Sequence, residues 1–363
     1  VTPVPAVLYQ WRAHKQSTAQ SLNAKPHAAI AGVKAVTEAC IRRGTPASVQ
    51  FERSTGHYRV DFVISDPKPL VSIVIPTRNA LAMLARCIDS IRAKTTYPNY
   101  EIVIVDNGSD DPAALDYLRH LADQRAARVV SSNAYFNFAR LCNTGVAQAK
   151  GEYVVLLNND TEVITPDWVQ AMLGLAQLPN CGAVGAKLLY EDGHVQHAGV
   201  VGLGDVIAGH SGRGRSSDDP MYVHYINTVH EAIAVTGACL CVKKQTYESV
   251  GGLDEHWVPN AYGDVDFCLR LRQRGLFSVY TPYAVLLHME SPSRKRNIET
   301  FERQYMRQRW GDILLSDPYV NPNLVRGECY AIDHRFAQAE VPAAHFGNLV
   351  AGAQEGRTDS LHY

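Results

Sequence analysis

Three consecutive polar residues, Asn158, Asn159 and Asp160, directly follow the apolar run of residues 153–157. The run is typical of a buried strand, and an apolar interior would reject these three side chains. Asp160 lies among other oxygen-bearing side chains, which is the environment that Mg²⁺ and Mn²⁺ prefer. One carboxylate does not make a metal site, so the cluster needs a second ligand.

His288 is the candidate for that second ligand, because it ends another apolar run, residues 284–287. An imidazole beside a carboxylate would favour Mn²⁺ somewhat over Mg²⁺. A histidine after an apolar run is, however, more often a packed, hydrogen-bonded residue. The pattern alone leaves both interpretations open.

Two further carboxylates, Asp264 and Asp266, lie in the segment AYGDVDFCLRLRQRG, where a helix is predicted over residues 264–274. Carboxylates in a first turn are stabilised by the helix dipole, so capping is one interpretation of both. A general base is the other. Their spacing does not separate the two roles.

The elements that would position these residues alternate between apolar strands and amphipathic helices. Strands are predicted over 71–76, 101–106, 128–132 and 153–157, and helices over 81–94, 112–123 and 138–149. This alternation predicts an α/β fold with a mostly parallel central sheet and helices on both faces. Ligands of such sheets bind at the carboxyl ends of the strands.

Polar loops follow the strands at this edge. They are Pro76-Thr77-Arg78-Asn79, Asp106-Asn107-Gly108-Ser109 and residues 158–160. Asn79 and Ser109 are also common N-cap types, so each loop alone could simply begin a helix. Three such loops at one edge favour a ligand site.

The rest of the chain is less regular. A helix is predicted over 25–43, a hairpin around Val49–Phe62, and a linker at 66–69. Further strands are predicted over 183–190, 233–243 and 277–287, a helix over 244–250, and a mobile glycine-rich loop over 199–214.

Composition limits the function classes. The 363 residues are 46% hydrophobic and carry a formal net charge of −1, which predicts a folded protein with no general attraction to nucleic acid. Its eight cysteines form no CxxC pair, so reduced buried thiols and a cytoplasmic location are expected. The sequence has no membrane-spanning run and begins at Val1, as expected of a piece of a longer protein or a processed chain.

Several familiar motifs are absent or incomplete. The GxG patterns at 202–204 and 212–214 lack a strand-to-helix turn, and neither a GxxxxGK[ST] loop nor HExxH occurs. Cys239 and Cys241 fit a buried strand better than a metal site. The basic run 294–296 could be a solvated patch or a phosphate clamp.

Taken together, residues 69–325 resemble the family 2 glycosyltransferases, inverting enzymes of the GT-A fold, especially bacterial enzymes of O-antigen and surface polysaccharide synthesis. The matching blocks, in the family's order, are VSIVIPTRN, EIVIVDNGSDD, FNFARLCNTG, YVVLLNNDTEV, TGACLCVKK, GGLDE, YGDVDFCLRLRQRG and LLHMESPSR. Residues 1–66 resemble instead the segment that follows a first module in tandem enzymes.

The resemblance implies roles for individual residues. Asn158, Asn159 and Asp160 occupy the family's DxD position, with Asp160 and His288 as metal ligands and Asp264 as the general base. Contact with the nucleotide sugar is implied for Pro76, Thr77, Arg78, Asp106, Asn107, Arg140, Asn143, Asn158, Asn159, Arg294 and Arg296, and the acceptor side for Trp257, Tyr262 and His197.

Two positions depart from the family pattern. Asn158 replaces the first acid of DxD, which removes one negative charge but keeps hydrogen-bonding capacity. Gly263 replaces the acid that usually precedes the base, so the tuning of Asp264 is left open.

The implied reaction moves a sugar from a nucleotide-diphosphate sugar, with Mn²⁺ or Mg²⁺, to a glycan or lipid-linked glycan. We expect a connecting segment at 1–66, a catalytic domain at 67–325 and a tail at 326–363, in a protein fused to another module and located at the inner face of the cell membrane. The rivals are a degenerate sugar-nucleotide or glycan-binding module and a nucleotidyltransferase. The latter is disfavoured because PTRNALAML has no glycine.

Overall fold

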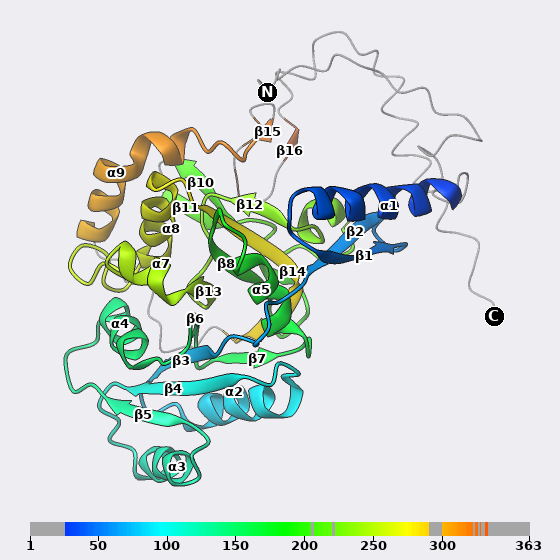
Figure 1. The fold of residues 1–363 in the computed structure, drawn as a ribbon. Helices are drawn as coiled ribbons and strands as arrows, with labels where there is room; N and C mark the ends of the chain where they lie inside the picture. The colour runs from blue at the N-terminus through cyan, green and yellow to red at the C-terminus, as the bar shows by residue number, and fades with distance from the viewer. Residues whose placement is uncertain are drawn as a thin grey trace, which may run out of the picture.

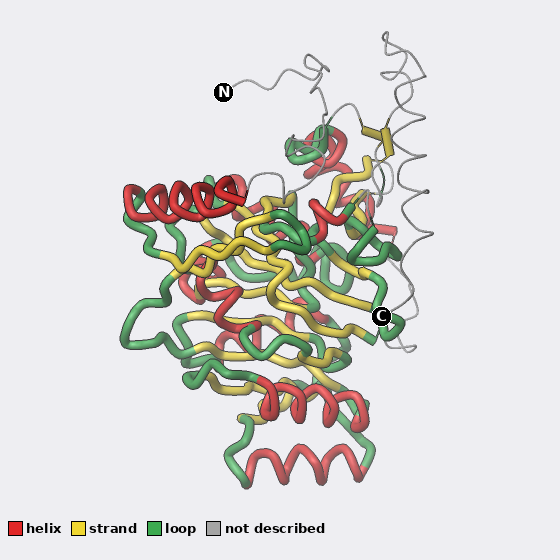
Figure 2. The backbone as a smooth tube through the Cα atoms, turned by 90° about the vertical axis from the view of Figure 1, so that its right-hand side faces the viewer, coloured by secondary structure: helices red, strands yellow, loops and turns green. Residues whose placement is uncertain are grey.

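The computed structural model describes residues 26–204, 207–219, 222–289, 300–321, 324–325, 327 and 331–332. A mixed sheet of ten strands runs through the middle of the molecule (Figures 1 and 2). Its strands lie in the order β12-β14-β8-β13-β6-β3-β4-β5, with β7 paired to β14 and β9 paired to β8.

One half of this sheet is parallel and is built from the alternating segments. Its strands are β3 (Val71–Thr77), β4 (Tyr100–Asp106), β5 (Arg128–Ser131) and β6 (Tyr153–Leu157), connected through α2 (Leu81–Lys94), α3 (Pro112–Asp123) and α4 (Phe138–Gln148). Each predicted segment of this half is confirmed, with ends that differ by at most one residue.

Alternate residues of the strands enter different hydrophobic cores on the two faces of the sheet. Ile73 and Ile75 of β3 belong to the core beneath α2, α3 and α5 (Trp168–Ala176). Val74 belongs to the core beneath α4, α8 (Gly263–Gln273) and α9 (Thr300–Leu315). The predicted α/β architecture with helices on both faces is therefore confirmed (Figure 1).

The other half of the sheet is mixed. It contains β7 (Thr161–Val163), β8 (Cys181–Leu189), β9 (Val195–His197), β12 (His230–Ala232), β13 (Cys239–Lys243) and β14 (Phe277–His288), with the short helices α6 (Val223–Ile226) and α7 (Lys244–Ser249). The β8 and β14 strands pair in parallel, and β13 lies antiparallel between β8 and β6.

The single strand predicted over 233–243 is wrong in its first half. β12 ends at Ala232 and β13 begins at Cys239, so residues 233–238 leave the sheet. These residues are mostly apolar and buried, and a hydrophobic run does not distinguish a buried strand from a buried turn. The break creates a turn that reaches the candidate site.

The mobile loop predicted over 199–214 is also wrong in part. It contains β10 (Val200–Gly204) and β11 (Ile207–His210), which pair antiparallel and pack against α9. A side chain at Gly202 would place its Cβ 2.4 Å from the Leu314 carbonyl oxygen. This glycine therefore serves close packing under α9 rather than flexibility.

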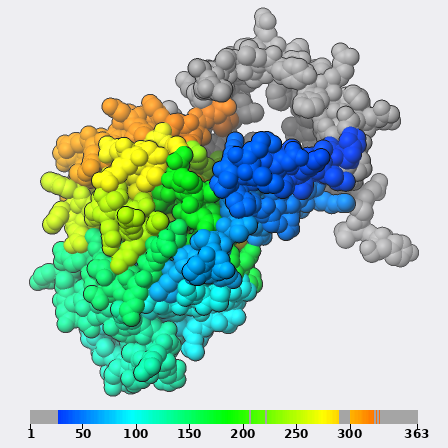
Figure 3. Space-filling view, in the orientation of Figure 1, coloured from blue at the N-terminus to red at the C-terminus, as the bar shows by residue number. Residues whose placement is uncertain are grey.

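The N-terminal helix and hairpin are confirmed as α1 (Pro26–Arg42), β1 (Ala47–Glu52) and β2 (His57–Phe62). The hairpin lies against the main body, as Figure 3 shows for its blue atoms. Arg59 Nη2 donates to Asp167 Oδ2 at 2.5 Å, and Tyr283 hydroxyl donates to Glu52 Oε2 at 3.4 Å. The hairpin therefore packs on α5 and β14.

The remaining described strands are β15 (Leu324–Val325) and β16 (Ala331–Ile332), which pair with each other. Every cysteine in the described ranges is a free thiol, and all are buried except the partly exposed Cys181. None of the helices that the structure describes is both long enough and apolar enough to span a membrane.

Gly145 sets how closely α4 approaches the sheet, and its replacement should destabilise the fold. A Cβ at Gly145 would lie 2.2 Å from Val74 Cγ1 and 2.9 Å from Val105 Cγ2. We expect Gly145→Ala to lower the free energy of unfolding by about 1–3 kcal/mol in urea titrations, because overpacking strains the core. Gly311→Ala, in α9 with no atom within 4 Å of the new Cβ, should instead raise it by about 0.5–1 kcal/mol. Equal effects of the two substitutions would contradict this packing argument.

Candidate active site

The carboxyl ends of the parallel strands bring the predicted polar loops to one edge. Thr77 at the end of β3 pairs with Asp106 at the end of β4, and Val74 pairs with Leu156 of β6. Asn159 Nδ2, in the turn after β6, donates to Thr77 Oγ1 at 2.9 Å. The loops after β3 and β6 are therefore in direct contact.

The loops after β3 and β4 are tied together through Asn79. Its Oδ1 accepts from the backbone N–H groups of Asp110 and Asp111 at 2.9 and 3.0 Å, and its own N–H donates to Ser109 Oγ at 2.8 Å. The N-cap of α2 is Ala80 and that of α3 is Asp111, so the capping interpretation of Asn79 and Ser109 is wrong. Both side chains instead join the loops after β3 and β4, which form the rim of the site.

Asp106 is the last residue of β4, and Asn107 follows it at the same edge of the sheet. Asp106 Oδ1 accepts from Ser109 Oγ at 2.5 Å, and Asn107 Nδ2 donates to the carbonyl oxygens of Ser132 and Ala134, each at 2.9 Å. Asn107 Oδ1 is buried and accepts no hydrogen bond from any described residue. A buried acceptor normally has a hydrogen-bond partner, so this oxygen is a candidate for contact with a ligand.

Pro76 and Arg78 differ in exposure. Pro76 is buried within β3, whereas the side chain of Arg78 is 56% exposed and only 3.8 Å from Asp110 Oδ2. An exposed ion pair of this kind contributes little, so Arg78 can turn toward a ligand at low cost.

Arg140 and Asn143, expected at the nucleotide, are bonded to a residue that the sequence did not single out. Arg140 Nε donates to Glu255 Oε2 at 3.1 Å, and Asn143 Nδ2 donates to Glu255 Oε1 and to the Leu253 carbonyl, both at 2.9 Å. Asn143 Oδ1 accepts from Tyr247 hydroxyl at 2.5 Å. The Asn143 amide therefore hydrogen-bonds within the protein, where it joins the loop of the GGLDE block to α4, and its contact with a nucleotide stays a prediction. Glu255 was visible only as part of that block.

Asp160 and His288 meet, as the metal hypothesis requires. Met289 N donates to the Asp160 carbonyl at 2.9 Å, and the β7–β14 pairing sets His288 opposite Thr161. His288 Nε2 lies 3.2 Å from Asp160 Oδ1 and 3.1 Å from Asn158 Nδ2. The side chains of all three residues of this cluster, Asn158, Asp160 and His288, are buried.

The donor atoms of this cluster fit a hard divalent ion. Two ligand atoms that each lie about 2.1 Å from an octahedral ion at a right angle are about 3 Å apart, close to the separation of His288 Nε2 and Asp160 Oδ1. Asn158 Oδ1 is buried and accepts no hydrogen bond within the described residues. No group of three or more His, Cys, Asp or Glu side chains is arranged for a metal in the described part of the chain. Donor phosphate oxygens and water would therefore have to complete the coordination, as is usual for Mg²⁺.

Asp264 lies in the first turn of α8 and is oriented by two backbone donors. Gly237 N donates to its Oδ2 at 2.8 Å, and Val265 N donates to its Oδ1 at 2.9 Å. Gly237 belongs to the turn of residues 236–239, in which the Ala238 carbonyl accepts from Asn158 N at 3.0 Å. This 236–239 turn therefore contacts Asp264 on one side and the Asn158–Asp160 cluster on the other.

The glycine that replaces the family's acid at 263 has a local steric reason. A Cβ at Gly263 would lie 3.1 Å from the Val258 carbonyl oxygen, a tight contact with the loop that precedes α8. Tyr262, the N-cap residue, has a left-handed backbone with φ of 59°. The backbone therefore bends sharply just before the helix that carries Asp264.

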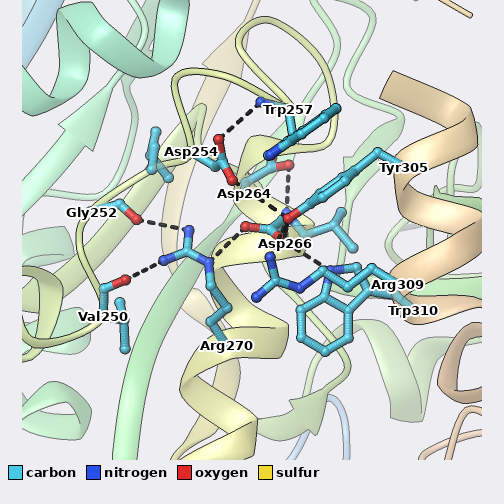
Figure 4. A network of polar contacts seen from close by, with 12 residues as sticks. Val250, Gly252, Asp254, Trp257, Asp264, Asp266, Arg270, Tyr305, Arg309 and Trp310 are labelled. Atoms are coloured by element: carbon cyan, nitrogen blue, oxygen red, sulfur yellow. Dashed lines mark hydrogen bonds and ion pairs between the residues drawn. The ribbon is translucent and has the colours of Figure 1, made fainter. Parts of the chain in front are cut away.

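Asp266 forms a buried ion pair with Arg270 rather than a helix cap. It is completely buried and accepts from Arg270 Nε at 2.7 Å and from Trp310 Nε1 at 2.8 Å (Figure 4). Arg270 also donates to the carbonyl oxygens of Val250 and Gly252. This network joins α8 to α9 and to the loop after α7.

Replacing Asp266 with asparagine should therefore cost stability. The side chain of Arg270 is only 13% exposed, and breaking a buried ion pair costs about 3–5 kcal/mol. We expect the free energy of unfolding to fall by about 3 kcal/mol in urea titrations. Asp116→Asn is the matched control, because Asp116 pairs with Arg119 at the surface and should contribute about 0–1 kcal/mol. A similar small loss for both would mean that the Asp266 pair is not stabilising.

The residues expected on the acceptor side divide into two groups. Trp257 is 56% exposed and stacks on Tyr305 of α9 with ring centroids 5.5 Å apart (Figure 4), while Tyr262 directly precedes α8. His197 is completely buried, and burial, with smaller effects of His210, His230 and His288, holds its pKa well below the usual range. His197 is therefore an interior neutral residue, and its placement on the acceptor side is wrong.

Arg294 and Arg296 lie outside the described residues. The whole basic run 294–296, the candidate phosphate clamp, lies outside them too.

Comparison with known proteins identifies the family. Residues 72–202 match the model of the glycosyl transferase family 2. The chain carries a family 2 glycosyltransferase domain. The predicted recognition is thereby confirmed, and the domain includes the Asn158–Asp160 cluster and the rim formed by the loops after β3 and β4.

Two curated relatives align with most of this chain. The chain is 41% identical over 331 residues to the uncharacterized protein y4gI of Sinorhizobium fredii and 35% identical over 299 residues to the O-antigen biosynthesis protein RfbC of Myxococcus xanthus. These alignments cover 88% and 81% of this chain but only 36% and 23% of the relatives' own lengths.

Two solved glycosyltransferases share the fold. The structure of GalNAc-T7 with UDP, GalNAc and Mn²⁺ gives a TM-score of 0.56 at 14% identity, covering 74% of this chain and 52% of that one. The mannosyltransferase PcManGT of Pyrobaculum calidifontis, in complex with GDP-Man and Mn²⁺, gives 0.50 at 17% identity, covering 91% and 90%. The predicted GT-A fold is confirmed.

Proposed function

We propose that this domain transfers a sugar from a nucleoside-diphosphate sugar to a hydroxyl group of a glycan, with inversion at the anomeric carbon and with a bound Mn²⁺ or Mg²⁺. The observation that carries the proposal is the 236–239 turn, which contacts Asp264 on one side and, on the other, Asn158 beside the buried pair of Asp160 and His288. A base and a diphosphate site on two sides of one turn suit a single displacement. The Mn²⁺ in both structural neighbours supports the metal.

Asp264 would take the proton of the acceptor hydroxyl. As that oxygen bonds to the anomeric carbon, the bond from this carbon to the diphosphate breaks, and the nucleoside diphosphate leaves with the bonding electrons. The Gly237 N–H group at 2.8 Å holds the carboxylate in one orientation, which reduces the reorganisation needed for proton transfer.

Asp160 and His288 would hold the divalent ion, and Asn158 would hydrogen-bond the ribose or a phosphate-bound water. When bound, the ion supplies positive charge that stabilises the departing diphosphate. Thr77, Arg78 and Asn107 at the rim would contact the nucleotide. Trp257, stacked on Tyr305, would offer an exposed aromatic face to an acceptor sugar.

The biological setting follows from the relatives and is part of the proposal. RfbC of Myxococcus xanthus is named as an O-antigen biosynthesis protein, which supports a role in bacterial surface polysaccharide synthesis. The location at the inner face of the membrane is part of the proposal. We infer that residues 67–325 are the catalytic domain and 1–66 a connecting segment in a protein with another glycosyltransferase module.

A panel of UDP-, dTDP- and GDP-sugars with Mn²⁺ tests this function. We expect one donor to raise the melting temperature and to be hydrolysed slowly without an acceptor. Asn158 and Gly263, which depart from the family pattern, motivate the alternative of a binding module without turnover. Stabilisation without hydrolysis or transfer would support that alternative, and no response to any donor would contradict both.

A further inference from the structure

Gln196 contacts both ends of His288. It lies on β9 and is 2% exposed. Its Nε2 lies 3.2 Å from the His288 backbone carbonyl oxygen, and its Oε1 lies 2.5 Å from His288 Nδ1. A single glutamine therefore bridges the main chain and the ring of one candidate metal ligand.

These two contacts determine where the ring hydrogen lies. A carbonyl oxygen can only accept, so the nitrogen of the Gln196 amide must face the His288 main chain. The amide oxygen then faces His288 Nδ1, and because that oxygen also only accepts, Nδ1 must carry a hydrogen. A neutral imidazole has one such hydrogen, which leaves a lone pair on Nε2.

The lone pair on Nε2 is directed at the proposed metal position. Asn158 Nδ2 lies 3.1 Å away and can donate to it, while Asp160 Oδ1 lies 3.2 Å away and can only accept as a carboxylate. Two acceptors this close are favourable when a cation lies between them. The neutral tautomer with hydrogen on Nδ1 is the form that coordinates a metal ion through Nε2.

We infer that Gln196 is a positioning residue, which fixes the Nδ1–H tautomer and the ring plane of His288 for the divalent ion. The inference rests on the metal site of the proposed function. Partners that accept a hydrogen bond from the second ring nitrogen are known to orient metal-binding histidines. Gln196 supplies the acceptor without adding a negative charge beside Asp160. His197, the next residue, was expected on the acceptor side, whereas Gln196 contacts His288.

Binding of Mn²⁺ alone, followed by electron paramagnetic resonance, gives the first test. Gln196→Met keeps similar volume but removes the acceptor, and we expect the dissociation constant to rise about 10- to 100-fold. Gln170→Met is the control, because Gln170 lies on α5, donates to Thr96 Oγ1 and should leave Mn²⁺ binding unchanged. Gln196→Glu keeps an acceptor for Nδ1–H and should bind Mn²⁺ more tightly than Gln196→Met. Unchanged affinity in a folded Gln196→Met protein would overturn the inference.

Nitrogen NMR of metal-free wild-type protein labelled at histidine gives a second test that needs no altered glutamine. We expect the His288 signal, assigned by its loss in His288→Gln, to show hydrogen on Nδ1. Hydrogen on Nε2 would overturn the inference. Wild-type protein that binds no Mn²⁺ would instead contradict the metal site of the proposed function, and the ring measurement would still decide the part that Gln196 plays.

Discussion

Asp264→Asn is expected to lower the turnover number by about 100- to 10,000-fold, the usual contribution of a general base. A sugar hydroxyl is a poor nucleophile, and asparagine cannot take its proton. The substitution is nearly isosteric, and its amide oxygen can still accept from Gly237 N, which donates to Asp264 Oδ2 at 2.8 Å in the native protein. The effect should therefore fall on chemistry and leave the site assembled.

The affinity for donor should stay close to that of the wild type in Asp264→Asn, because a residue that acts only in the transition state changes turnover rather than binding. Asp266→Asn, two positions along the same helix, should show the reverse pattern of lost stability with retained turnover. Turnover near the wild-type value in Asp264→Asn would show that another group is the base.

Asp160→Asn is expected to weaken Mn²⁺ binding and to lower kcat/KM by at least about 100-fold, because the charge stabilisation supplied by a bound metal is worth several kcal/mol. Asp160 is the one carboxylate of the buried cluster, since Asn158 replaces the other acid of the motif. Isothermal titration of a nucleoside diphosphate with Mn²⁺ and with EDTA measures the effect.

Asp116→Asn makes the same change of charge on the surface of α3 and should behave like the wild type in this titration. In the wild type, EDTA should abolish most of the affinity for nucleoside diphosphate. Equal affinity for the nucleoside diphosphate with Mn²⁺ and with EDTA would contradict the assignment of Asp160 and His288 as metal ligands.

The parallel half of the sheet could be predicted from local patterns. Its strands are continuous apolar runs and its helices carry one apolar face, so each element is specified by residues within a few positions of one another. The rule that ligands bind at the carboxyl ends of such strands then located the rim of the site. Asp160 and His288 were joined by the same logic together with the family resemblance, and they lie 3.2 Å apart.

Features that depend on distant partners could not be predicted in this way. The glycines of residues 199–214 suggested flexibility, but the closeness of Gly202 to the Leu314 carbonyl is set by the packing of α9. The apolar residues 233–238 suggested a strand, although they form a buried turn. In both cases the residue types can be read from the sequence, but the conformation of the segment is determined by its contacts with distant residues.

Residues that hold other site residues were the least visible. Glu255 binds Arg140 and Asn143, more than 100 positions away, and Gln196 binds His288 at a separation of 92. A single glutamate or glutamine has no local pattern that reveals such a partner. The burial of His197 and the internal partners of Asn143 could not be predicted for the same reason, because their surroundings come from other segments.

The anomeric configuration of the transferred sugar tests the central claim most directly. The donor found in the panel should be incubated with an acceptor and Mn²⁺, and the coupling constant of the new anomeric proton measured by NMR before any non-enzymatic change. A single displacement assisted by Asp264 predicts a configuration opposite to that of the donor. Retention of the donor's configuration would contradict the proposed mechanism.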